Sequence, residues 1–479
     1  MTELPPDIWY HIASFIPPQE LVKLAGVNRV LFELALGKQW NSIKFSTGAI
    51  RLKELERLSD PFIGKRVHDM TLVLYLRADI EQSRSKGIRI LQRQINLPLL
   101  PSPLTLFRRE PKRSQNQRLD LSQSANFGEA IGSVIAFAPK LVNIRELTIR
   151  CTWNLVPHLS HNVIRPLLAP FSSAVGINLR CLILDGSLDE LRILLQERPT
   201  FSSLEELHLV FKETSHASEY NDAGQSVLVD IVAPFIHRLG AHLETLSIKS
   251  YCEREAQELE DFFLAISPLH SLARLDIHAA FIKPSRYPRS LMSLFTDNLQ
   301  HLSLPLIPFK LHLEPATQEP LSDWLLSCIS NENLFIQLRS LDIYPTKTSK
   351  GLDILLAYIH RSAKHLSRLA VRSRSLQPDE VPRFVHALAQ CHCLTDLSFN
   401  IHRLDTAVFD QLSRELPYLY RLCISSSFFE DLKKRHYADW SVKDIWIKNM
   451  DENVHRDVML VIARSLPSVR SLFGVPVLA

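Results

Sequence analysis

The fold is decided by the stretch Leu204-Glu205-Glu206-Leu207-His208-Leu209, in which apolar residues hold the first, fourth and sixth positions. Its second half alternates polar and apolar residues, which is typical of a short strand with one buried face. The same spacing returns along the chain at steps of 23 to 39 residues. Its eleven copies begin at Ile144, Leu179, Leu204, Leu243, Leu272, Leu299, Leu338, Leu366, Leu394, Leu419 and Val442, and a degraded copy begins at Val469.

Between these copies lie segments with the periodicity of amphipathic helices. Segments 187–198, 225–239, 351–365 and 405–416 repeat apolar residues every three or four positions. One strand and one helix cannot bury their own apolar faces, whereas a stack of such units can. The pattern therefore predicts an α/β solenoid.

This succession resembles the leucine-rich-repeat family from about residue 144 to the C-terminus. The resemblance implies a horseshoe of parallel strands with helices on its convex side. The family's Asn or Cys, three places after the last apolar residue, is missing here, because residues such as Thr152, Ser187 and Tyr251 stand there. We therefore expect an irregular curve without a regular asparagine ladder.

The first 45 residues follow a different pattern, that of three short helices. Pro6 suits the first turn of a helix that carries Ile8, Ile12 and Phe15. Pro17 and Pro18 end that helix and open a second one. Asn28 can cap a third helix, for which Gly37 is the expected end.

This segment resembles the F-box motif. The resemblance is carried by Leu4-Pro5, Ile8, Ile12, the Pro17-Pro18 break, Leu21, Leu24, Val27, Arg29 and Trp40. Asn28 replaces a frequent Cys, and the aromatic residue that usually follows is shifted to Phe32. The resemblance implies a substrate receptor that binds the Skp-type adaptor, and through it the cullin, of an SCF ubiquitin ligase.

The adaptor contacts that this resemblance implies are Leu4, Pro5, Ile8, Ile12, Leu21, Leu24 and Val27. Some of them must also fill the core of so small a unit, and the sequence does not separate the two roles. The alternative is a repeat scaffold without any link to ubiquitin, whose N-terminal helices only cap the solenoid.

The sequence predicts four parts: an F-box at 1–45, a linker with a first irregular repeat at 46–98, a flexible basic insertion at 99–126, and the repeat domain at 127–479. The irregular repeat is suggested by Val67, Met70 and Leu72, which have the repeat spacing. The insertion is rich in Pro, Ser and Arg; a solvated loop is favoured over a nuclear-localisation signal or a patch for an acidic partner. Longer loops are expected at 214–224 and 307–320.

Composition excludes several classes of protein. The formal net charge is only +4 over 479 residues, which argues against a dedicated nucleic-acid binder. Seven irregularly spaced cysteines argue against a disulfide framework. Charged residues interrupt any N-terminal signal peptide, and no run is long enough to span a membrane. We therefore expect a protein of the cytosol or nucleus.

We expect neither an enzyme nor a cofactor or metal site. No G-x-G occurs among the 13 glycines, and phosphate-binding, zinc-protease and serine-hydrolase motifs are missing. The run Cys391-His392-Cys393 lacks the wider spacing and further ligands of a zinc site, so buried cysteines are the favoured interpretation.

Residues that alternate with the buried strand positions should point to the exposed face of the sheet, which is the usual binding face of such arrays. Trp446 could anchor a partner there, and Arg368, Arg372 and Arg421 could form a basic patch for an acidic or phosphorylated peptide. The alternative is that these are ordinary solvated strand residues. The candidate substrate face consists of Lys249, Arg274, His278, Tyr344, Arg368, Arg372, Arg421 and Trp446.

Overall fold

The structure is a computed structural model of the chain. It describes residues 4–46, 57–75, 127–152, 164–212, 226–250, 259–266, 268–279, 289–305, 318–429, 435–448, 461–462, 464–472 and 475–476. No helix within these ranges is long and apolar enough to cross a membrane.

A single sheet of fifteen strands runs through the described ranges, and its strands follow sequence order. Strands β1 to β14 are parallel to their neighbours, whereas β15 pairs antiparallel to β14. The strands are β1 (Ser42–Ser46), β2 (Asp69–Tyr75), β3 (Glu146–Thr152), β4 (Cys181–Gly186), β5 (Glu206–Phe211), β6 (Thr245–Ser250), β7 (Arg274–Ala279), β8 (His301–Leu304), β9 (Ser340–Ile343), β10 (Arg368–Leu376), β11 (Asp396–Leu404), β12 (Arg421–Phe429), β13 (Asp444–Lys448), β14 (Ser471–Leu472) and β15 (Val475–Pro476).

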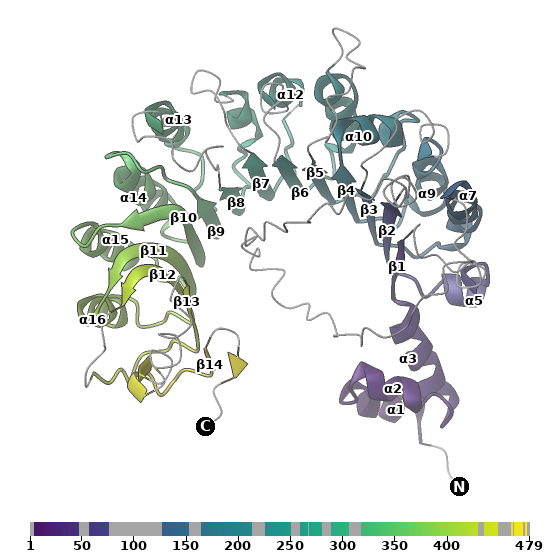
Figure 1. Ribbon diagram of the computed structural model, residues 1–479, viewed down its shortest axis with the longest axis horizontal. Helices are drawn as coiled ribbons and strands as arrows, with labels where there is room; N and C mark the ends of the chain where they lie inside the picture. The colour runs from purple at the N-terminus through teal and green to yellow at the C-terminus, as the bar shows by residue number, and fades with distance from the viewer. Residues whose placement is uncertain are drawn as a thin grey trace, which may run out of the picture.

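Helices cover the outer side of the curved sheet, and the strands line its inner side (Figure 1). The predicted horseshoe with helices on the convex side is therefore confirmed. The helices are α1 (Pro6–Ser14), α2 (Pro18–Lys23), α3 (Arg29–Trp40), α5 (Pro61–Gly64), α7 (Phe127–Phe137), η2 (Ala138–Lys140), α9 (Leu168–Val175), α10 (Leu188–Leu195), η3 (Leu228–Val232), α11 (Ala233–Leu239), α12 (Leu259–Ala265), η6 (Arg289–Leu294), α13 (Glu319–Ile329), α14 (Gly351–Ser362), α15 (Glu380–Leu388) and α16 (Thr406–Glu415).

The repeated phrase is the physical basis of this stacking. In the copy on β5, Leu204, Leu207 and Leu209 are fully buried. The register sets Leu207 beside Leu182 of β4 and Leu246 of β6, so that equivalent leucines form a continuous row. Each such side chain contributes about 1.5–3 kcal/mol relative to an exposed one, and neighbouring repeats share that burial.

The sheet begins earlier in the chain than expected. Strand β2 lies at the irregular repeat predicted around Val67, but β1 precedes it and lies partly within the range 1–45 predicted for the helical unit. Trp40, Ile43 and Phe45 have the same spacing as the repeats, and all three pack against the solenoid core. The strand phrase therefore starts directly at the end of the third helix.

Helices α10, α11, α14 and α16 lie within the segments whose periodicity predicted them. The predicted insertion at 99–126 and the predicted loop at 214–224 lie outside the described residues, as do residues 307–317 of the second predicted loop.

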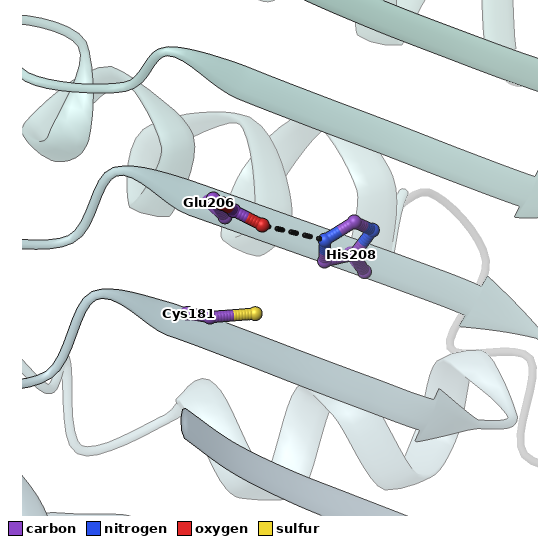
Figure 2. Close-up of side chains that lie close together, drawn as sticks. All are labelled: Cys181, Glu206 and His208. Atoms are coloured by element: carbon purple, nitrogen blue, oxygen red, sulfur yellow. Dashed lines mark ion pairs between the residues drawn. The ribbon is translucent and has the colours of Figure 1, made fainter. Parts of the chain in front are cut away.

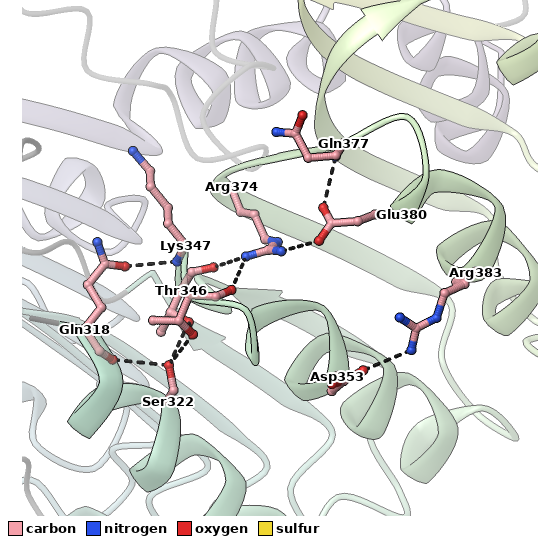
Figure 3. Close-up of polar contacts among 10 residues, drawn as sticks. Gln318, Ser322, Thr346, Lys347, Asp353, Arg374, Gln377, Glu380 and Arg383 are labelled. Atoms are coloured by element: carbon pink, nitrogen blue, oxygen red, sulfur yellow. Dashed lines mark hydrogen bonds and ion pairs between the residues drawn. The ribbon is translucent and has the colours of Figure 1, made fainter. Parts of the chain in front are cut away.

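A buried polar network holds the loop after β9 against α13 (Figure 3). Ser322 on α13 forms hydrogen bonds with the hydroxyls of Thr346 (2.9 Å) and Thr348 (2.8 Å). Gln318 accepts hydrogen bonds from the Tyr344 hydroxyl (2.6 Å) and from the backbone N–H of Lys347 (2.9 Å). Such a satisfied network fixes one loop conformation at the junction of two repeats.

Arg374 on β10 closes the same network from the next repeat (Figure 3). Its buried guanidinium donates to the backbone carbonyls of Thr346 (2.8 Å) and Thr348 (3.0 Å), and it pairs with Glu380 of α15 (2.5 Å). Thr346 has a positive φ of 74°, a conformation that a β-branched residue rarely adopts. The arginine therefore stabilises a loop that would be strained by itself.

Candidate functional site

Two surfaces could bind partners: the helical head, which is formed by α1, α2 and α3 over residues 4–40, and the concave surface, which is formed by the outward side chains of β2 to β13. The head lies at one end of the array, and its last helix leads into β1 (Figure 1).

The local sequence explains the three helices of the head. Proline occupies the first turn of both α1 and α2, where no intrahelical N–H bond is lost. The predicted cap on α3 is confirmed, because Asn28 Oδ1 accepts a hydrogen bond from the Leu31 N–H at 2.8 Å. The helix continues through Gly37 to Trp40, beyond its predicted end.

The head has a small hydrophobic cluster of its own, distinct from the solenoid core. Four of its described side chains are buried, and they are Ala13, Leu21, Leu31 and Ala35. Trp40, by contrast, packs against the core of the repeats. The head is therefore joined to the array through the end of α3 but buries its own apolar residues separately.

The structure shows which of the predicted adaptor contacts fill the core of the head and which lie on its surface. Leu21 is only 2% exposed and fills the head's own cluster, so of the two roles it takes that of a core residue. Leu24 is half-buried against the same cluster. The remaining predicted contacts are exposed: Leu4, Pro5, Ile8, Ile12 and Val27.

The head exposes further large apolar side chains that the motif resemblance did not single out as contacts. They are Tyr10, Phe15, Val22 and Phe32. Eight of the fifteen exposed large hydrophobic side chains in the described chain thus lie within residues 4–32. The α1 spacing of Ile8, Ile12 and Phe15 predicts a shared helix face but cannot tell whether that face is covered.

On the concave surface, the predicted basic residues are paired with carboxylates of neighbouring strands. Arg372 binds Asp342 through two 2.7 Å hydrogen bonds, from Nε and Nη2. Burial opposes the charge of Arg372, but the hydrogen bonds to Asp342 raise its pKa overall. This pair is bidentate and half-buried, which is the stronger kind of ion pair.

The other two arginines share their carboxylate partners. Arg421 Nη1 lies 2.9 Å from Asp396 Oδ1, and its Nη2 lies 3.6 Å from Asp444 Oδ2. Arg368 Nη2 lies 3.7 Å from the same Asp396 oxygen. The surface here is an alternating charge ladder across β9 to β13 rather than the uncompensated basic patch that the sequence suggested.

Tyr344 was predicted to point outward, and the structure contradicts this. Strand β9 ends at Ile343, so the alternation of its side chains does not extend to Tyr344. The ring is buried and its hydroxyl donates to Gln318. Tyr344 therefore belongs to the polar network after β9 and not to the concave surface.

The other predicted residues of the substrate face are half-buried strand residues. Lys249 Nζ lies 3.8 Å from Asp276, and the Arg274 side chain is aligned with Thr245 and His301 on the adjacent strands. Burial lowers the pKa of His278. Trp446 on β13 is half-buried beside Cys423 of β12. These residues lie on the same surface but are spread over several strands.

Comparison with known proteins adds a likeness of fold only. No protein-family model matches the chain, and no curated protein matches it. Among solved structures, the chain is similar to the crystal structure of a complex of Rad7 and Elc1 in yeast, with a TM-score of 0.36 and 15% sequence identity. The match covers 65% of this chain and 77% of that chain. A likeness of this size carries no inference about function.

Proposed function

We propose that this protein is the substrate-recognition subunit of an SCF-type ubiquitin ligase. In this proposal the F-box-like segment 1–45, which contains the head, binds a Skp-type adaptor and through it a cullin. The repeats at 127–479 bind a target protein in the cytosol or nucleus. The chain itself would perform no catalytic step.

The observation that carries the proposal is the exposed apolar surface of the head. A unit of this size that buries only four of its described side chains is marginal by itself, and the eight large apolar side chains that it exposes favour an interaction site. The segments that expose this surface are those that resemble the F-box motif. The separate cluster of the head also favours a docking module over a simple cap, since a cap would share the core of the first repeat.

The concave surface supports the second half of the proposal. Its outward side chains are half-buried, charged and ordered into pairs across strands, so it presents a fixed pattern of opposite charges. Patterns of this kind favour partners with complementary charge and disfavour others. A protein target with alternating acidic and basic groups fits better than a uniformly acidic peptide.

The test is adaptor binding by the full-length chain, measured by titration calorimetry against a purified Skp-type adaptor. We expect the double substitution Leu4→Ala with Pro5→Ala to weaken binding at least about tenfold, because both side chains are exposed and precede the first helix. The matched control is Leu264→Ala, which removes a leucine of α12 that is even more exposed than Leu4.

Circular dichroism should show both variants folded. Adaptor affinity that is the same in the wild type and the double variant would contradict the proposal. Failure of the wild type to bind the adaptor at all would instead favour a repeat scaffold whose N-terminal helices cap the array.

A further inference from the structure

Three potential metal ligands of different chemistry converge on the concave surface at β4 and β5. Register pairs Cys181 of β4 directly with Glu206 of β5, and His208 follows two residues later on the same face of β5. Figure 2 shows Glu206 and His208 side by side on one strand, with Cys181 on the neighbouring strand. The Cys Sγ, one carboxylate oxygen and one imidazole nitrogen all lie within 4.8 Å of one another.

The His208–Glu206 pair already has the spacing that a tetrahedral ion requires, and the thiol lies within 4.8 Å of both. With zinc–sulfur bonds of about 2.3 Å and zinc–nitrogen or zinc–oxygen bonds of about 2.0–2.2 Å, neighbouring ligand atoms stand roughly 3.3–3.6 Å apart. His208 Nε2 and Glu206 Oε2 already lie 3.5 Å apart. Small side-chain rotations would bring the Cys181 thiol to the same spacing, because none of the three side chains is fully buried.

The surroundings favour a cation. Glu146 of β3 and Glu206 of β5 are the two register partners of Cys181, and Asp69 of β2 stands one strand further along the same row. This negative field would stabilise a divalent ion through Coulomb attraction at short range. The cluster of Cys181, Glu206 and His208 lies outside the ion pairs of β9 to β13, and binding an ion would give it a role of its own.

We propose that Cys181, Glu206 and His208 form a zinc site on the concave surface. A thiolate with an imidazole selects zinc over magnesium or calcium, which prefer oxygen ligands. Three protein ligands leave the fourth position of the tetrahedron open to water, as in zinc sites that remain accessible. The ion would tie β4 to β5 on the surface proposed to bind targets.

The test uses the metal-free, full-length protein titrated with Co²⁺, a spectroscopic substitute for zinc. We expect one equivalent to produce the near-ultraviolet charge-transfer band of a thiolate–cobalt bond, and Zn²⁺ to remove it. Cys181→Ser should abolish the band. The control Cys423→Ser, at an outward position of β12, should retain it.

A second variant keeps the thiol in place. Glu206→Gln should still give the band at saturating Co²⁺ but should weaken the affinity at least about tenfold, since it removes a charged ligand. The proposal is overturned if the wild type shows no thiolate band, or if the band persists unchanged in Cys181→Ser. An unchanged affinity in Glu206→Gln would remove that residue from the ligand set and refute the site as proposed.

Discussion

Arg374→Met should open the junction between two repeats. The guanidinium makes two hydrogen bonds to the carbonyls of Thr346 and Thr348 and one ion pair with Glu380, and its side chain is only 8% exposed. Methionine matches the length of the stem but supplies no donor. Removing one partner of a buried, hydrogen-bonded pair costs about 3–5 kcal/mol.

Hydrogen exchange of peptides covering residues 340–380 is the suitable assay, because a long repeat array need not unfold in one step. The free energy of local opening in these peptides should fall by about 3–5 kcal/mol in Arg374→Met. Combining it with Glu380→Gln should cost less than the sum of the two single changes, since the double variant leaves no unpaired carboxylate.

The chain provides a matched control in Arg383→Met. Arg383 pairs with Asp353 at 3.0 Å between adjacent helices, but both side chains are mostly exposed, so the loss should stay below about 1 kcal/mol (Figure 3). The reasoning is refuted if Arg374→Met and Arg383→Met change local opening by similar amounts, or if the effects of Arg374→Met and Glu380→Gln simply add.

Two further predictions concern burial in the head and in the first repeats. Leu21→Ala should unfold the head at a cost of about 2–5 kcal/mol, whereas Val27→Ala, at a residue that is 58% exposed, should leave it folded; hydrogen exchange over residues 6–40 distinguishes them, and equal exchange in the two variants would refute the assigned roles. Burial raises the pKa of Glu190 from 4.5 to about 7, even though the Ser187 N–H donates to its carboxylate. The folded state therefore holds this proton more tightly than the unfolded state, and the contribution of Glu190 to stability falls as the pH rises towards 7. The thermal stability of Glu190→Gln relative to the wild type should increase between about pH 5 and pH 7 and stay constant above pH 7. A stability difference that does not change with pH would contradict the raised pKa.

The spacing of leucines was sufficient to predict the solenoid, because one buried face per strand determines which side chains point inward and which strands align. The same sequence carries two further signals. Trp40, Ile43 and Phe45 repeat the phrase within the segment assigned to the head, and they form β1. The outward positions of the copies that begin at Leu179 and Leu204 place Cys181, Glu206 and His208 together.

Other features could not be predicted from periodicity. Whether Leu21 or Val27 is enclosed depends on how three helices pack, since both positions satisfy the motif. The ion pairs of Arg372 and Arg421 depend on which carboxylates the neighbouring strands present. Tyr344 is buried because β9 ends one residue earlier and the following loop folds onto α13.

The most direct test of the central claim is the hydrogen-exchange footprint of a Skp-type adaptor on the full-length protein. The proposal predicts protection of residues 4–32, strongest around Ile8, Ile12 and Val27, with the strands of the repeats unchanged. Protection confined to the concave surface, or no protection anywhere in the chain at saturating adaptor, would contradict it.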